Sequence, residues 1–241
     1  MIAHSCDNDV CKLLNPCIYE LLPYSEVIIR VTEVEKDTYF IMKNYKKMEM
    51  LITGPFDLFD WANRHMVYQI PNVEFVQGLA NKIRDIDAKT ILEVGAGRGI
   101  ISKYVGNVLN KKIILTDSYG WWKYYGRTKN IELADVLKRT YIDAIEEFEP
   151  DLIIASWIPF DECWTKDFRK YPFVKGYLLI GEGKGGATGC LEDWDADWKM
   201  QYLEDVSNYG ICKTDHGFHM EESIFRILHT DVTYFERPNE Q

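Results

Sequence analysis

The stretch from Thr90 to Gly99 most strongly constrains how this chain folds. Its first part, Ile91–Val94, is apolar apart from one glutamate, which is typical of a central strand buried on both faces of a parallel sheet. Three glycines follow at alternate positions, where glycine permits a sharp turn and lets a ligand lie against the backbone: Gly95, Gly97 and Gly99. From Ile100 the apolar residues recur at helical spacing. Strand, glycine loop and helix in this order predict the first unit of a nucleotide-binding α/β fold.

The glycine spacing separates two classes of cofactor. A dinucleotide fingerprint needs Gly-x-Gly-x-x-Gly, and its last position here is Ile100. The pattern that begins at Glu93, Glu-x-Gly-x-Gly-x-Gly, resembles motif I of the class I S-adenosylmethionine (SAM) methyltransferases. The resemblance implies that SAM is the cofactor and that Glu93 contacts its methionine end. It also implies that the loop wraps the amino-acid and ribose parts through Gly95, Ala96, Gly97 and Gly99.

The next two segments agree with this interpretation. A second strand, 112–117, ends in Asp117, whose carboxylate can accept hydrogen bonds from both ribose hydroxyls, with Ser118 beside it. Further along, Asp143 and Ala144 precede a short acidic helix, Ile145 to Phe148. The resemblance implies that this pair brackets the adenine. It spans Val73 to Phe235, which is most of the chain.

The end of the fourth strand, 151–157, is the most informative stretch for the methyl acceptor. Ser156 and Trp157 are expected to contact the cofactor there. Ile158-Pro159-Phe160 matches the last three positions of a motif found in amino-methyltransferases, but Trp157 replaces its polar first residue. An indole nitrogen only donates hydrogen bonds, so this departure argues against methylation of a nucleic acid base. We expect Trp157 and Phe160 to bind a cationic or planar acceptor, with strand-end packing as the alternative for Trp157.

Glu182 follows the fifth strand, Tyr177 to Ile180, inside the glycine-rich segment Gly181–Gly186. Because open α/β sheets bind ligands at the carboxyl ends of their strands, we expect Glu182 to orient or deprotonate the acceptor. The alternative is that its carboxylate accepts backbone amides from its own loop. Methyl transfer from a sulfonium depends mainly on positioning, so the absence of a catalytic triad is no objection.

The order of segments predicts an α/β fold with a doubly wound, mostly parallel, seven-stranded sheet. An antiparallel hairpin is expected from Cys212 to Phe235, with its clearest strand starting at Phe225, and a helix is expected over 194–203. Residues 1–71 are expected to form an N-terminal α+β elaboration, with helical spacing from Phe59 to Ile70, and residues 72–241 the methyltransferase core.

Composition excludes some classes of partner. The net charge of −10 argues against a domain that grips nucleic acid phosphates over a broad surface, although a small basic cleft is still possible. No apolar run approaches the ~18 residues of a membrane span. The first residues lack a signal peptide, so a cytoplasmic location without membrane contact is predicted.

The six cysteines are expected to be free thiols in such a location: Cys6, Cys11, Cys17, Cys163, Cys190 and Cys212. The first three lie near His4 but lack the C-x-x-C spacing of a zinc knuckle, so no metal site is predicted. The aromatic segment Trp121–Tyr125 is either part of a pocket or loop packing, and His216 and His219 receive no role.

These features together predict a SAM-dependent methyltransferase acting on a small-molecule acceptor. The alternatives are a nucleic acid or protein N-methyltransferase and a SAM-binding scaffold without turnover. The sequence leaves the acceptor atom and the oligomeric state open.

Overall fold

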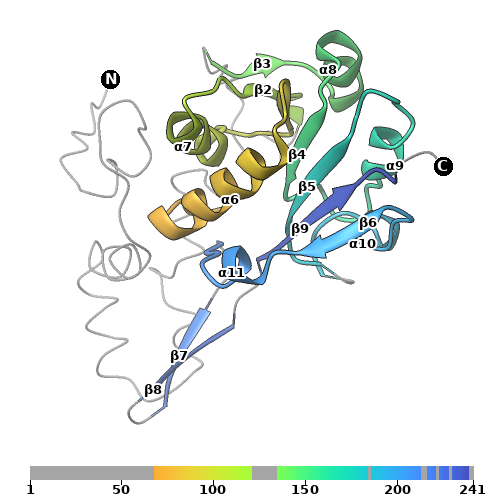
Figure 1. Ribbon diagram of the computed structural model, residues 1–241. Helices are drawn as coiled ribbons and strands as arrows, with labels where there is room; N and C mark the ends of the chain where they lie inside the picture. The colour runs from red at the N-terminus through yellow and green to blue at the C-terminus, as the bar shows by residue number, and fades with distance from the viewer. Residues whose placement is uncertain are drawn as a thin grey trace, which may run out of the picture.

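The main element is a seven-stranded sheet in the order β3-β2-β1-β4-β5-β9-β6 (Figure 1). The computed structural model describes residues 68–120, 135–183, 186–212, 216–220, 223–227 and 230–238. The first five strands of the sheet are parallel, and β9 runs antiparallel to both of its neighbours. The strands are β1 (Ile91–Val94), β2 (Ile114–Asp117), β3 (Leu137–Lys138), β4 (Leu152–Ser156), β5 (Gly176–Gly181), β6 (Lys199–Tyr202) and β9 (Asp231–Glu236).

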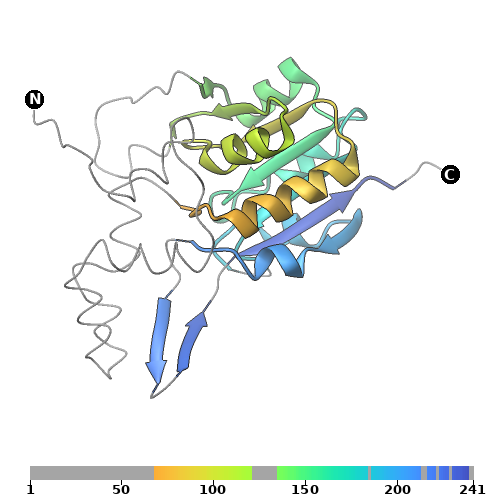
Figure 2. The same ribbon diagram turned by 60° about the vertical axis from the view of Figure 1, so that its left-hand side comes forward.

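Helices cover both faces of this sheet (Figures 1 and 2). Adjacent residues of a strand point to opposite faces, so Ile154 of β4 packs with one helical layer and Ile153 with the other. The first layer contains α6 (Val73–Ile86), α7 (Ile100–Leu109) and α11 (Glu204–Ser207). The second contains α8 (Tyr141–Phe148), α9 (Thr165–Phe168) and α10 (Leu191–Trp194). The predicted doubly wound, mostly parallel seven-stranded fold is therefore confirmed.

The strand order reverses between β1 and β4. The chain runs from β1 through β2 to β3 on one side, then crosses back to β4 and continues to β5 on the other. β1 consequently pairs with β2 and with β4. In open α/β sheets the crevice outside the carboxyl ends at such a switch point is the usual ligand site.

The start of α6 explains where the core begins. Asn72 is its N-cap and accepts a hydrogen bond from the Phe75 amide at 2.9 Å. The amide group of the same side chain donates to the Tyr209 carbonyl at 2.8 Å, which ties the helix to the loop after α11. Just before it, Gln69 forms an antiparallel bridge with Cys212, so the predicted helical spacing does not continue to Ile70.

The predicted antiparallel hairpin between Cys212 and Phe235 is present, with Phe225 in one of its strands, but it lies outside the main sheet. The segment with Phe225 belongs to β8 (Ser223–Ile227), which pairs with β7 (His216–Met220) in a separate two-stranded sheet that projects from the main one (Figure 2). The single antiparallel strand inserted into the main sheet is β9 instead.

The predicted helix over 194–203 is wrong, because α10 ends at Trp194 and residues 199–202 form the edge strand β6. Trp194 and Trp198 are both buried, and their spacing of four residues imitates a helix. The backbone leaves the helical region at Asp195, with φ −121° and ψ 60°.

Several predictions lie outside the described residues: the elaboration over 1–67, the cysteines and histidine near the N-terminus, and the aromatic segment Trp121–Tyr125. The proposed domain boundary at residue 71 stays a prediction. Within the part of the chain that the structure describes, no helix combines the length and apolar character needed to cross a membrane.

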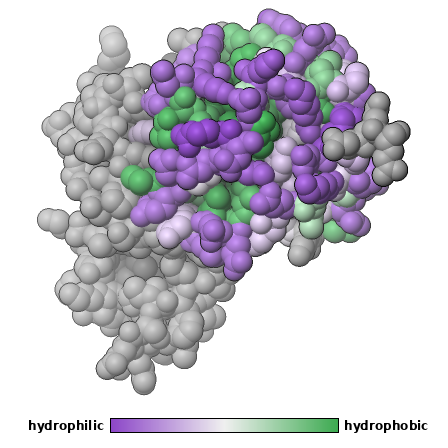
Figure 3. Space-filling model, viewed as in Figure 1, coloured by the Kyte–Doolittle hydropathy of each residue, from purple (hydrophilic) through white to green (hydrophobic). Residues whose placement is uncertain are grey.

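The face seen in Figure 3 is mainly hydrophilic over the described residues, with apolar side chains in small separate groups. A hollow of about 200 Å³ beside α7 is lined by Lys103, Lys111 and Lys112 among others. Its lining includes the residues that lead into β2, at the amino end of that strand, so it is not the crevice at the carboxyl edge.

Candidate functional site

The glycine loop after β1 lies at the switch point. Its backbone dihedral angles explain why three of its residues are glycines. Gly95, Gly97 and Gly99 have φ values of 62°, 55° and 63°, in the left-handed region that residues with a Cβ rarely adopt. A Cβ at Gly99 would lie 2.5 Å from Leu115 Cδ1, so close packing on β2 also requires glycine there.

Two amides anchor this loop to β2. The Ala96 amide donates to the Thr116 carbonyl at 2.9 Å, and the Gly97 amide donates to Asp117 Oδ2 at 2.8 Å. The other Asp117 oxygen accepts from the Tyr119 amide. Asp117 is only 1% exposed, so a ribose can reach its carboxylate only after the covering groups move. Its predicted contact with the ribose stays a prediction.

Glu93 lies beneath the loop and is 3% exposed. Burial raises the pKa of its carboxyl to about 8; the Asp117 carboxylate raises it as well, whereas Ser102 and Lys103 lower it. Among the described residues, Glu93 Oε2 is buried without a hydrogen-bond partner. A buried acid with an unsatisfied oxygen is suited to bind a cation or a donor from a ligand.

The residues predicted near the adenine have local contacts. Thr140 caps α8: its Oγ1 accepts from the Asp143 amide at 3.2 Å and donates to Asp143 Oδ2 at 2.7 Å. Asp143 is exposed, whereas Ala144 is fully buried in the core. Ser118 is exposed, and its Oγ accepts from the Gly120 amide at 3.3 Å. These contacts tie the Asp143 side chain to the cap residue Thr140, and its predicted contact with adenine is untested.

Trp157 immediately follows Ser156 at the end of β4, in an unusual backbone conformation. Its φ is 56°, in the left-handed region, which costs a large L-residue roughly 1–3 kcal/mol and persists only where the surrounding contacts hold it. Its amide donates to the Ile180 carbonyl at 2.8 Å. The indole packs against the Tyr68 ring, with centroids 4.3 Å apart and planes tilted by 32°, and Nε1 donates to Gln69 Oε1 at 3.0 Å.

Gln69 is a candidate site residue that sequence reasoning missed, because no motif surrounds it. It is 5% exposed, and its Oε1 also accepts from Thr230 Oγ1 at 3.2 Å. Within the described part of the chain its buried Nε2 has no hydrogen-bond partner. Gln69 therefore positions Trp157 and retains a donor for another group.

The two remaining predicted acceptor residues differ in exposure. Phe160 is 72% exposed and is free to meet a ligand. Glu182 is half-buried, and its Oε2 accepts from the Ala187 amide at 2.9 Å. Its own amide donates to Thr188 Oγ1 at 2.9 Å. These bonds within the loop match the structural alternative for Glu182, and its role toward an acceptor stays a prediction.

An aromatic pair that sequence reasoning also missed lies against the glycine loop. A Cβ built on Gly95 would lie 3.0 and 3.1 Å from two ring atoms of Trp164. Trp164 stacks on Tyr141 with centroids 4.6 Å apart and planes 15° from parallel. The rings come from the segments after β4 and β3, so only the fold brings Trp164 to Gly95 and Tyr141 to Trp164.

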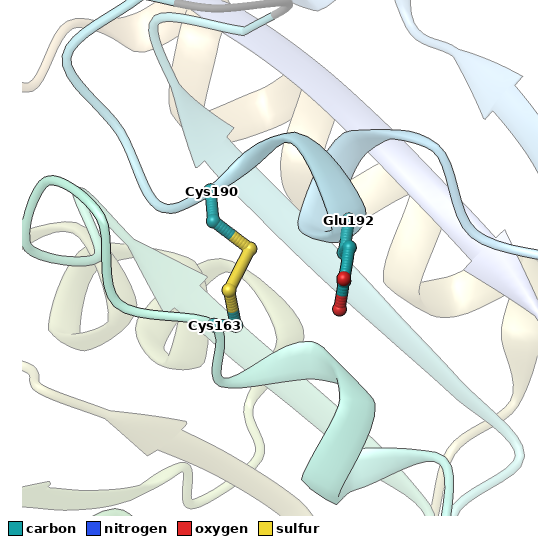
Figure 4. A group of neighbouring side chains, drawn as sticks. All are labelled: Cys163, Cys190 and Glu192. Carbon is teal, nitrogen blue, oxygen red and sulfur yellow. A yellow bond between two sulfur atoms is a disulfide. The ribbon is translucent and has the colours of Figure 1, made fainter.

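The prediction of free thiols is wrong for two cysteines. Cys163 and Cys190 form a disulfide, with Cα atoms 5.3 Å apart, between residues separated by 27 positions (Figure 4). The segments after β4 and β5 leave neighbouring parallel strands at the same edge, which brings the two residues together. Cys212 is a buried thiol that forms no disulfide, as predicted.

Comparisons with known proteins add little. No family model matches the sequence, and no curated protein matches it. A SAM-dependent O-methyltransferase from Thermotoga maritima is 9% identical with a TM-score of 0.43, over 77% of this chain and 73% of that one. Human N-acetylserotonin methyltransferase in complex with SAM is 11% identical with a TM-score of 0.41, over 99% and 69%. TehB from Haemophilus influenzae is 13% identical with a TM-score of 0.41, over 76% and 68%.

These TM-scores and identities are too low to assign a function to this chain. The interpretation of the site therefore depends on this chain's own topology and residues.

Proposed function

We propose that this protein is a SAM-dependent methyltransferase that modifies a small-molecule acceptor. The observation that carries the proposal is the arrangement at the switch point. A loop with three left-handed glycines is anchored to Asp117 there, next to the buried Glu93, one of whose oxygens has no hydrogen-bond partner among the described residues. These are the positions that the sequence motif assigns to a SAM site.

The chemistry of these groups fits SAM. Glu93 would hold the cationic methionine end, since a buried carboxylate is stabilised by an adjacent positive charge. Asp117 would hold the ribose diol, because a carboxylate at the end of β2 can accept hydrogen bonds from both hydroxyls. Trp164 and Tyr141 provide a stacked aromatic surface against the glycine loop for a planar group. SAM, when bound, supplies a methyl group already activated by its sulfonium.

The residues that would meet the acceptor follow β4 and β5. Trp157 is held by Gln69 at the strand end, and the exposed Phe160 offers an apolar surface beyond it. Glu182 would orient the acceptor or take its proton, provided that its carboxylate exchanges the Ala187 amide for the acceptor. The catalytic contribution of these side chains is to position the acceptor and to exclude water.

Charge supports a small acceptor over a polymer. The net charge of −10 disfavours broad contact with phosphates. A cytoplasmic location remains part of the proposal. Structural disulfides are rare in that reducing compartment, so the Cys163–Cys190 bond counts against it unless the bond is redox-active, and fractionation of cells tests the location.

The proposal is tested by methyl transfer from isotopically labelled SAM to panels of phenols, amines and thiols, followed by mass spectrometry. RNA and peptide panels are run in parallel. The expected result is labelled product from a small molecule and none from the polymers. Transfer only to RNA or peptide would establish the N-methyltransferase alternative. SAM binding without transfer to any acceptor would favour a scaffold.

A further inference from the structure

The disulfide joins the two segments that carry the proposed acceptor residues. Cys163 follows Trp157 and Phe160 in the segment after β4, and Cys190 follows Glu182 in the segment after β5. The bond therefore links both sides of the proposed acceptor site at the carboxyl edge of the sheet.

Both cysteines of the disulfide are partly exposed to solvent. Cys212, by contrast, is fully buried. Figure 4 shows the bond crossing from the loop ahead of α9 to the start of α10, with Glu192 of α10 beside it. A carboxylate oxygen of Glu192 lies within 4.8 Å of each sulfur.

Other bonds between the segments remain when the disulfide is broken. Asp193 is fully buried, and its Oδ1 accepts from the Thr165 amide at 2.8 Å and from Thr165 Oγ1 at 2.7 Å. Within the second segment, Asp193 Oδ2 also accepts from the Cys190 amide at 3.1 Å, which fixes the start of α10. The Asp161 amide donates to the Gly189 carbonyl at 3.0 Å. Reduction would therefore loosen the segments locally while these anchors keep the fold.

The loosened residues lie next to the proposed cofactor and acceptor groups. Cys163 precedes Trp164, whose ring contacts the glycine loop at Gly95. Cys190 lies two residues after Thr188, whose Oγ1 accepts from the Glu182 amide. A change at the disulfide thus reaches both sides of the site through one or two residues.

We infer that Cys163 and Cys190 are a reversible redox-modification site whose oxidation state controls the mobility of Trp164 and Glu182. The effect on SAM rests on the proposed function, whereas the effect on the segments does not. Disulfides in reducing compartments are rare and are usually catalytic or redox-sensing.

The reduction by a small thiol such as glutathione balances in two exchanges. A glutathione thiolate attacks one protein sulfur, the protein S–S bond breaks, and a mixed disulfide and one protein thiolate form. A second glutathione thiolate attacks the glutathione sulfur of the mixed disulfide, which releases oxidised glutathione and the second protein thiolate. Both protein thiolates then take protons from water. The reverse sequence oxidises the pair.

Glu192 sets the rate of this exchange. Its negative charge lies beside both sulfurs and disfavours the thiolate, which is the attacking form during oxidation. Glu192→Gln should therefore speed reoxidation by glutathione disulfide. The comparison variant is Glu162→Gln, which removes a negative charge from the residue that precedes Cys163. The Glu162 carboxylate accepts a hydrogen bond from Trp164 Nε1 at 2.7 Å.

The test equilibrates the full chain in glutathione redox buffers without denaturant. Thiol labelling with mass spectrometry gives the oxidised fraction, and the buried Cys212 reports unfolding if it becomes labelled. Hydrogen exchange is measured over 157–164, 186–190 and 95–99, and the affinity for S-adenosylhomocysteine is measured in both states. The double variant Cys163→Ser/Cys190→Ser serves as a permanent mimic of the reduced form.

The inference predicts a reversible two-electron transition with Cys212 protected, faster exchange in these segments on reduction, and a change of about fivefold in affinity. The double variant should match the reduced protein.

A disulfide that resists millimolar glutathione, or reduction that changes neither hydrogen exchange nor affinity, would overturn the redox inference. Tight Zn²⁺ binding by the reduced pair that blocks reoxidation and is lost in Glu192→Gln would replace it with a metal site. No binding of S-adenosylhomocysteine in either state would refute the proposed function, and hydrogen exchange would still decide the redox inference.

Discussion

Binding of SAM should release a proton from Glu93. The pKa of this buried carboxyl is raised to about 8, so about 0.9 of it is protonated at pH 7. A cation placed beside a carboxylate lowers its pKa by roughly 1–3 units. A decrease of about two units leaves roughly 0.1 protonated at pH 7, so about 0.8 proton should be released per SAM bound.

The sign of the pH dependence follows from this release. Because the bound state holds fewer protons at Glu93, affinity for SAM should rise between about pH 6 and pH 8 and level off above it. Titration calorimetry at pH 7 in buffers of different ionisation enthalpy counts the protons directly. The amino group of SAM itself titrates nearby, so the quantity of interest is the difference between the wild type and Glu93→Gln.

Glu93→Gln keeps the size of the side chain and removes its titration. The variant should release about 0.8 fewer protons per SAM than the wild type. Equal proton counts in the two proteins would refute the assignment of Glu93 to the cationic end of SAM. An affinity that falls between pH 6 and pH 8 in the wild type alone would refute it as well.

The remaining predictions concern Asp117, Glu182, Trp157 and the disulfide. Asp117→Asn should weaken SAM at least about tenfold by calorimetry, since hydrogen bonds to a charged group contribute roughly 1.5–3 kcal/mol each, while Asp135→Asn, at an exposed carboxylate paired with Lys103, should not. Glu182→Gln should lower turnover while SAM affinity and Tm hold; a lower Tm with unchanged turnover per folded molecule would make Glu182 structural. Trp157→Ala should raise the KM of the acceptor more than the Kd of SAM, and the opposite order would place the indole against the cofactor. Replacing both cysteines of the disulfide with serine should lower the free energy of unfolding by about 3.5 kcal/mol in urea, because a bridge across 27 positions restricts the unfolded chain; an unchanged value would contradict this origin of stability.

The sequence predicted the central part of the fold because strand, glycine loop and helix are local patterns. β1, the glycine loop and α7 occur where the period of apolar residues changes. The C-terminal part was not predictable in the same way. The burial of Trp194 and Trp198 depends on the sheet that covers them, and β9 pairs with strands distant in sequence.

The residues of the candidate site also fall into those that local sequence patterns could predict and those that they could not. Motif spacing identified Glu93 and Asp117, whereas Trp164 and Gln69 reach the site only through packing between distant segments. The disulfide was missed for a related reason: a spacing of 27 residues has no signature, and only the adjacency of β4 and β5 brings the cysteines together.

The most direct test of the SAM site is titration calorimetry of the purified chain with SAM, S-adenosylhomocysteine, NAD and FAD. The account predicts saturable binding of about one SAM or S-adenosylhomocysteine per chain, and none of the dinucleotides, because the third glycine comes one residue too early for their fingerprint. Binding of NAD or FAD, with no heat from either SAM species, would contradict it.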